Sequence, residues 1–264
     1  MESVLSKYWM VVMKHLFTLF LVLGLSQTLF AQNFDHKHSV WDQLLKKHVK
    51  NGLVSYKGFV SDATTLNGYL EGLTKVTESQ YQSFSDKEKM SFLINAYNAF
   101  TVKLIIDHYP IDSITDIGSP ISKINLARGI PWKKEFFSLL GKFRHLDWIE
   151  HEKLRKDFLE PRIHFAIVCA SIGCPNLQSE AYIPTNLEKQ LQSAKLGFLK
   201  NPKKNSYDKT TNTLYLSKIF NWFQTDFTKK TTLIQFVQDG FDDTIKPDAK
   251  IIYTDYNWDL NELK

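Results

Sequence analysis

Most of the chain alternates apolar and polar positions with the three- to four-residue repeat of helices. Residues 36–50 place apolar side chains on one face and end at Asn51-Gly52, which predicts a first helix. Similar patterns predict further helices over residues 61–76, 147–155, 185–199, 217–227 and 231–238.

One segment, residues 90–108, is apolar around nearly its whole circumference, which predicts a helix buried on most sides. A capping box at residues 85–88 marks its start. Its polar residues fall on a single stripe that includes Asn95 and Asn98. Because buried amides need hydrogen-bond partners, the two asparagines either tie down the backbone of neighbouring loops or face a site.

Strand patterns are short and lie in the middle and at the end of the chain. Residues 162–169 form an apolar run that predicts a central strand. Further strand signals are an extended segment, two hairpins and a last strand, at residues 54–60, 136–146, 205–217 and 251–254. Helices outnumber strands, so we expect an α+β fold: a single domain over residues 33–264, mainly helical with a small central β-sheet and hairpins.

The first 31 residues have the charged start, apolar middle and small-residue end of a signal peptide. The stretch that begins at Met13 has all three parts by itself, which favours Met13 as the true start. Its apolar run is too short to span a bilayer comfortably. We therefore expect an exported protein, periplasmic or secreted after cleavage and not integral to the membrane.

Composition is that of a globular protein, 43% hydrophobic and 23% charged, with a net charge of +5. The lysines are scattered along the chain and line no helix face together with aromatic residues, so nucleic-acid binding is not expected. No cofactor is indicated. The pair His36 and His38 has the spacing of metal ligands, but chain ends tend to fray, so no metal site is expected there.

Both cysteines lie in one segment, RIHFAIVCASIGCPNL, residues 162–177. Side chains alternate along a strand, so His164 and Cys169 would point to opposite faces. Cys169 would then be a packed core thiol or a disulfide partner.

Cys174 follows the predicted strand in a loop and would be a fixed, accessible thiol. Such a thiol becomes a nucleophile when a histidine lowers its pKa and a third group orients that histidine. The candidate bases are His151 and His164, and the candidate orienting residues are Asn95 and Asn98. Three states of the cysteines remain open: a Cys169–Cys174 disulfide, which an oxidising compartment permits, two free structural thiols, or a reactive Cys174.

Five segments together resemble the DUF547 family, which is named for its lack of an assigned function. The resemblance spans roughly residues 85–260 and implies an exported bacterial domain of uncharacterised activity. The segments are FLINAYNAF, HLDWIEHEKLR, PRIHFAIVCASIGCPNL, LSKIFNWFQTDF and YNWDLN. The positions that match are Asn95, Asn98, His151, Arg155, His164, Cys169, Ser171, Cys174 and Pro175.

Two functions follow from these residues. The first is a thiol-dependent hydrolase or acyltransferase that acts on peptide or cell-envelope material, with Cys174 as the nucleophile. The second is a non-catalytic binding or scaffold domain in which Cys169 and Cys174 form a structural pair.

Overall fold

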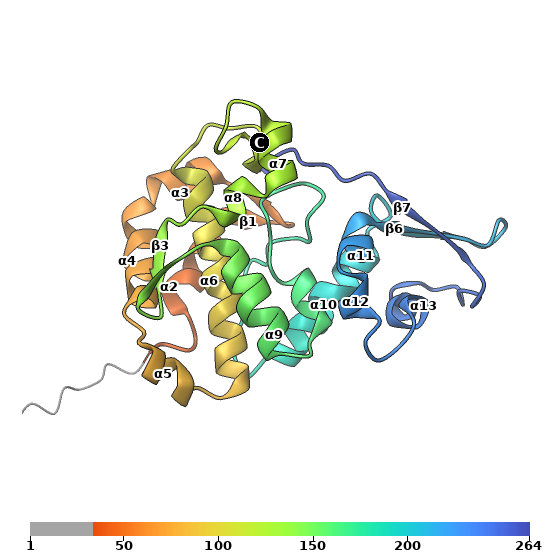
Figure 1. The fold of residues 1–264 in the computed structure, drawn as a ribbon, viewed down its shortest axis with the longest axis horizontal. Coiled ribbons are helices and arrows are strands. Elements are labelled where there is room, and N and C mark those ends of the chain that lie inside the picture. Colours follow the sequence, from red (N-terminus) through yellow and green to blue (C-terminus); the bar gives the residue numbers. More distant parts are fainter. Residues whose placement is uncertain (1–33) are drawn as a thin grey trace, which may run out of the picture. The chain divides into compact units, whose positions relative to one another are not determined.

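The fold is organised around one long helix, α6 (Asp86–Ile106), which the computed structural model of the chain places among the other helices (Figure 1). The structure describes residues 34–264, of which Asp35–Lys264 form one compact unit. The predicted signal peptide and its start at Met13 lie outside the described residues.

Helix α6 confirms the prediction from its apolar circumference. The hydroxyl of Ser85 accepts a hydrogen bond from the Glu88 backbone N–H, and the Glu88 carboxylate accepts one from the Ser85 N–H. This capping box satisfies backbone donors that the first turn leaves free. Nearly every side chain from Met90 to Ile105 is buried, so this part of the helix is covered on most sides and forms the centre of the helical core.

In the described part of the chain, four shorter helices precede α6: α2 (Ser39–His48), α3 (Tyr56–Ser61), α4 (Ala63–Thr74) and α5 (Glu78–Ser83). Helices α3 and α4 pack directly on α6. The predicted strand at residues 54–60 is wrong for most of its length, because only the two-residue strands β1 (Val49–Lys50) and β2 (Leu53–Val54) pair there. The Ser55 side chain instead caps α3 by accepting from the Gly58 N–H.

The middle of the chain, after α6, consists of short helices and a hairpin and ends in a helix with π-helical turns. After η1 (Ile114–Asp116), α7 (Ser122–Arg128) and α8 (Ile130–Lys133), the strands β3 (Phe137–Leu139) and β4 (Lys142–Arg144) form the predicted hairpin. Its turn uses left-handed backbone at Leu140 and Gly141, where the glycine avoids the steric cost of a side chain. The predicted helix at 147–155 is present as η2 (Trp148–Leu154), which has π-helical turns, and α9 (Arg155–Asp157).

The predicted central strand at residues 162–169 is wrong. Pro161–Phe165 is the 3₁₀ helix η3, and an irregular loop follows it. The side chain of Asn98 takes the place of a strand partner: its amide donates to the Ala166 carbonyl, and its oxygen accepts from the Val168 N–H. A buried apolar run needs its backbone groups paired, and a side chain of α6 supplies that pairing instead of a sheet.

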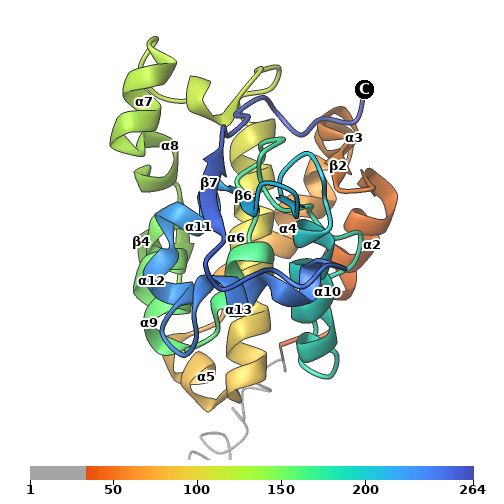
Figure 2. The same ribbon diagram turned by 90° about the vertical axis from the view of Figure 1, so that its right-hand side faces the viewer.

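The C-terminal part has its own apolar core, built on α10 (Leu187–Leu199) and a three-stranded sheet. Strand β6 (Thr213–Ser217) pairs antiparallel with β5 (Ser206–Asp208), as the predicted hairpin requires, and parallel with β7 (Lys250–Thr254). The predicted helix 217–227 is broken at Phe223 into α11 (Lys218–Trp222) and α12 (Gln224–Phe227), and α13 (Leu233–Val237) and η4 (Gln238–Gly240) follow. Figure 2 shows β7 beside α11.

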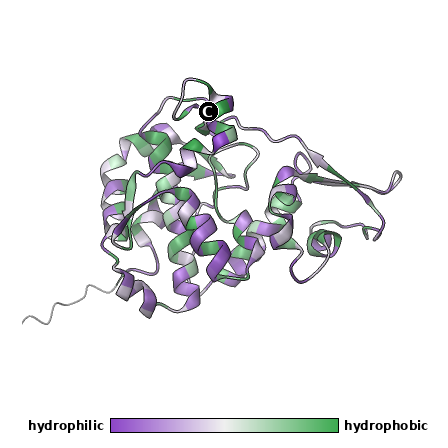
Figure 3. Cartoon of the chain, in the orientation of Figure 1, coloured by the Kyte–Doolittle hydropathy of each residue, from purple (hydrophilic) through white to green (hydrophobic). Residues whose placement is uncertain are grey.

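The predicted fold class is confirmed: the domain is mainly helical α+β with small sheets of two or three strands. Hydrophobic and hydrophilic residues alternate along most of the helices (Figure 3). Among the described residues, none of the helices combines the length and the apolar character needed to cross a membrane.

Candidate functional site

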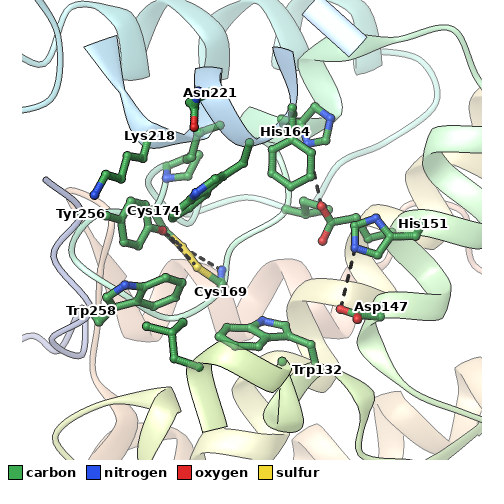
Figure 4. Close-up of a pocket in the computed structure, with 18 of the residues that line it drawn as sticks. Trp132, Asp147, His151, His164, Cys169, Cys174, Lys218, Asn221, Tyr256 and Trp258 are labelled. Carbon is green, nitrogen blue, oxygen red and sulfur yellow. Dashed lines mark hydrogen bonds and ion pairs between the residues drawn. A yellow bond between two sulfur atoms is a disulfide. The ribbon is translucent and has the colours of Figure 1, made fainter. Parts of the chain in front are cut away.

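A cavity of about 720 Å³ opens between η2, the loop after η3, helix α11 and the segment after β7. Its walls are rich in aromatic side chains, as Figure 4 shows for Trp132, Tyr256 and Trp258. The Tyr256 and Trp258 ring centres lie 4.5 Å apart, and Tyr256 lies 4.9 Å from Trp222. Trp222 is 45% exposed, so these rings offer apolar faces to a ligand from outside. We call this cavity the aromatic pocket.

A carboxyl group, Glu150, is buried in the aromatic pocket. Its side chain is only 10% exposed and interacts with Tyr97 of α6. Burial, together with the neighbouring Asp147, raises the pKa of Glu150 from 4.5 to about 8. Asp147 directly precedes η2 and lies three positions before Glu150, and its negative charge disfavours ionisation of Glu150. At neutral pH Glu150 is therefore mainly a neutral acid that can give up a proton.

His164 lies beside this acid and is held by Asp226 of α12. The His164 Nε2–H donates to the Asp226 carboxylate at 2.9 Å, while Nδ1 lies 3.8 Å from Glu150 Oε1. The hydrogen bond from His164, together with Arg155, lowers the pKa of Asp226, so this carboxyl is ionised and accepts. Burial lowers the pKa of His164. The ring is therefore neutral, with its unprotonated nitrogen toward Glu150.

His151 occupies the more exposed edge of the pocket. Its Nδ1 accepts a hydrogen bond of 2.9 Å from the Arg155 guanidinium, and its Nε2 lies 3.9 Å from Asp147 (Figure 4). Arginine has only donors, so Nδ1 cannot carry a proton. Burial lowers the pKa of His151, and burial also raises the pKa of Asp147. At this edge of the pocket, the Nε2–H of His151 is thus directed toward a second carboxyl, that of Asp147.

The two cysteines form a disulfide, Cys169–Cys174, which is one of the three states the sequence left open. Both residues line the aromatic pocket, on the side of Tyr256 rather than that of His151 (Figure 4). The Tyr256 hydroxyl lies 3.1 Å from the Cys174 sulfur. Among residues 34–264 there is no free cysteine, so the structure contains no thiolate that a histidine could activate.

Two sequence expectations about these cysteines are corrected by the structure. Cys174 is 3% exposed and therefore buried, whereas Cys169 is half-buried and the more accessible of the two. Cys169 and His164 line the same cavity instead of facing opposite sides. The second error arose because the expected alternation of side chains requires a strand, and residues 161–165 form a 3₁₀ helix.

Comparison with protein families identifies part of this chain. Residues 81–199 match the family described as "Protein of unknown function, DUF547". This segment belongs to the DUF547 family. The resemblance predicted from the sequence is thus confirmed. No curated protein and no solved structure gives a significant match to the chain.

The DUF547 segment supplies most of the chemistry of the pocket but not all of it. Glu150, His151, His164 and both cysteines lie within the matched residues. Asp226, Tyr256 and Trp258 lie beyond residue 199. The pocket is completed only when the C-terminal segment folds against the DUF547 segment.

Asn95 and Asn98 are not among the residues that line the pocket, and their side chains bond to backbone. Both are buried on α6, and Asn95 exchanges two hydrogen bonds with the backbone of Tyr182, at 2.7 Å and 3.1 Å. Asn98 makes its two bonds to the loop after η3. These contacts match the loop-holding alternative that the sequence left open, and the residue that orients His164 in the structure is Asp226.

Sequence reasoning missed Glu150, Asp226 and Tyr256 as site residues. A signal for each was present, because they lie in three segments that resemble the family, HLDWIEHEKLR, LSKIFNWFQTDF and YNWDLN. As for metals, residues 34–264 contain no group of three or more histidine, cysteine or acidic side chains placed to hold an ion.

Proposed function

We propose that this DUF547 protein is an exported hydrolase that uses general acid–base catalysis in the aromatic pocket, with Glu150 as proton donor. The observation that supports it is a single carboxyl whose burial raises its pKa to about 8 beside a second carboxyl, Asp147. Environments that hold one acid protonated near neutral pH are characteristic of catalytic proton donors.

The reaction needs two complementary groups. Glu150 gives its proton to the leaving-group oxygen of the substrate as the bond to that oxygen breaks. Asp147, which is the more exposed of the two carboxyls at 19%, accepts a proton from the water that attacks the substrate. His164 presents an unprotonated nitrogen toward Glu150 and so adds no positive charge that would favour the ionised acid.

The walls of the pocket favour a substrate built from rings with apolar faces. Tryptophan and tyrosine supply large rigid surfaces with a polar edge, and a pair of carboxyls beside them is the usual equipment for cleaving glycosidic bonds. A glycan of the cell envelope therefore fits the pocket best. Export is part of the proposal and rests on the signal-peptide pattern of residues 1–31.

The test is the release of new reducing ends from envelope glycan by the purified protein. We expect the E150Q variant to lose at least about a hundredfold in rate, the usual contribution of a general acid. E152Q is the matched control, because Glu152 lies on the same helix and is half exposed, paired with Lys156. Equal rates for wild type and E150Q would refute the proposal.

A thiol-dependent hydrolase or acyltransferase with Cys174 as nucleophile is a second candidate. Its support is that both cysteines line the same pocket as His151 and His164. This function requires reduction of the disulfide, so a peptide or ester substrate would be turned over only with reductant present. C174S would abolish that turnover and E150Q would not. Binding of glycan without any turnover would instead favour a non-catalytic binding domain.

A further inference from the structure

A second cavity, of about 530 Å³, shares the residues Cys174, Pro175, Asp255 and Tyr256 with the aromatic pocket. Its character is different, because amide and lysine side chains replace the aromatic walls. We call it the amide pocket. The asparagines and lysines that line it are Asn51, Asn176, Asn201, Asn257, Asn261, Lys203 and Lys204.

The walls of the amide pocket are closely fitted loops. Gly52 has a left-handed backbone and lies so near Asn176 that an added Cβ would be 2.3 Å from its Cγ. At Gly173 an added Cβ would lie 2.9 Å from the Tyr256 ring. Only glycine permits these approaches, so the cavity is bounded by segments held in a defined arrangement.

Lys204 places a cation in this cavity without a carboxylate partner among residues 34–264. Its ammonium donates to the backbone carbonyl of Cys174 and lies 5.4 Å from the Phe198 ring centre. Burial alone lowers the pKa of Lys204 to about 8. The acidic residue of the pocket, Asp255, is fully exposed and pairs with Lys218 at 3.5 Å.

A partly buried charge without a counter-charge is costly, and a bound anion would remove that cost. The partly buried ammonium of Lys204 matches one negative charge, whereas the other lysine of the pocket, Lys203, is exposed to solvent. The surrounding asparagines offer both donors and acceptors, which suits hydroxyl or amide groups next to the charge.

We propose that the amide pocket binds a small polar carboxylate, with Lys204 pairing with its charge and the asparagine side chains bonding its neighbouring polar groups. This concerns binding alone and does not depend on acid–base catalysis by Glu150. Because the two cavities share part of their walls, a carboxylate held by Lys204 would lie next to a ligand in the aromatic pocket.

The experiment is a calorimetric titration of the full chain with sodium glucuronate, glucose and inorganic phosphate. Glucuronate should bind the wild type more tightly than glucose or phosphate does. K204M keeps much of the aliphatic stem but removes the charge, and it should weaken glucuronate binding at least about tenfold, the value of one charge-assisted hydrogen bond. K200M is the matched control, since Lys200 is exposed at the end of α10. It should bind like the wild type.

Three outcomes would overturn the proposal: no binding of glucuronate to the wild type, equal binding by K204M, or a preference for glucose or phosphate. If K204M does not fold, K204R serves in its place, because it keeps the charge and should retain glucuronate binding over glucose. Loss of that preference in a folded K204R would also contradict the proposal. E150Q should leave glucuronate binding unchanged, which separates this result from the fate of the proposed hydrolase.

Discussion

Replacing Glu150 by glutamine should make the protein relatively more stable as the pH rises. In the unfolded chain this carboxyl ionises near 4.5, whereas burial in the folded protein raises its pKa to about 8. Between these values the folded state holds a proton that the unfolded state has released. The free energy of unfolding of the wild type therefore falls with increasing pH through this window. Glutamine cannot ionise, so E150Q lacks this contribution.

The size of this change in the free energy of unfolding follows from the interval between the two pKa values. Each pH unit inside it changes the free energy of unfolding by about 1.36 kcal/mol. From pH 5.5 to pH 7.5 the difference between E150Q and wild type should therefore shift by about 3 kcal/mol in favour of E150Q. Glutamine nearly matches the size of the protonated acid and keeps a hydrogen-bonding oxygen near Tyr97, so the substitution mainly tests the charge.

Urea unfolding of both proteins at the two pH values provides the measurement. E152Q is again the control, and its difference from wild type should change little between pH 5.5 and pH 7.5. A difference between E150Q and wild type that stays constant with pH would refute the reasoning. A shift in favour of the wild type would show that Glu150 is ionised and stabilised in the folded protein.

Three further results are expected. N98A should lower the free energy of unfolding by about 3 kcal/mol in urea titrations, because it leaves the buried backbone groups of Ala166 and Val168 without partners. A loss well under 1 kcal/mol would contradict the role of Asn98 in holding this loop. Iodoacetamide should label neither cysteine until the disulfide is reduced, and should then label Cys169 before Cys174; labelling of the unreduced protein, seen by mass spectrometry, would argue against the disulfide. Because the disulfide closes a short loop, its reduction should lower the free energy of unfolding by about 2 kcal/mol. D226N should lower the pKa of His164 further, because Asp226 favours the charged ring, and an unchanged imidazole titration by NMR would show that the pairing is absent.

Local sequence patterns predicted the helix and the hairpins that are determined by interactions between residues close together in the chain. The capping box and apolar circumference of α6 depend on residues within one helix, and so the sequence located that helix well. The hairpin at residues 136–146 and the one at 205–217 likewise follow from short runs around a turn. In each case the interactions that decide the structure join residues close together in the chain.

The apolar run at residues 162–169 is a segment whose structure local sequence patterns did not predict. Its composition is that of a buried strand, but a strand needs a neighbouring strand to pair with its backbone. In the folded protein that need is met by the amide of Asn98, far away in the sequence. The expected positions of His164 and Cys169 depended on the strand, and they were wrong with it.

The sequence by itself determined the fold class and the DUF547 resemblance, because these depend on residue types and local periodicity. It named His151, His164 and both cysteines as candidates, but not Glu150 or Asp226. Only the tertiary structure decided which side chains meet. It buried Glu150 beside His164, brought Asp226 from α12 to hold that histidine, and closed Cys169 onto Cys174. Burial and long-range pairing set the pKa of the Glu150 carboxyl, and neither is visible until segments distant in the chain pack together.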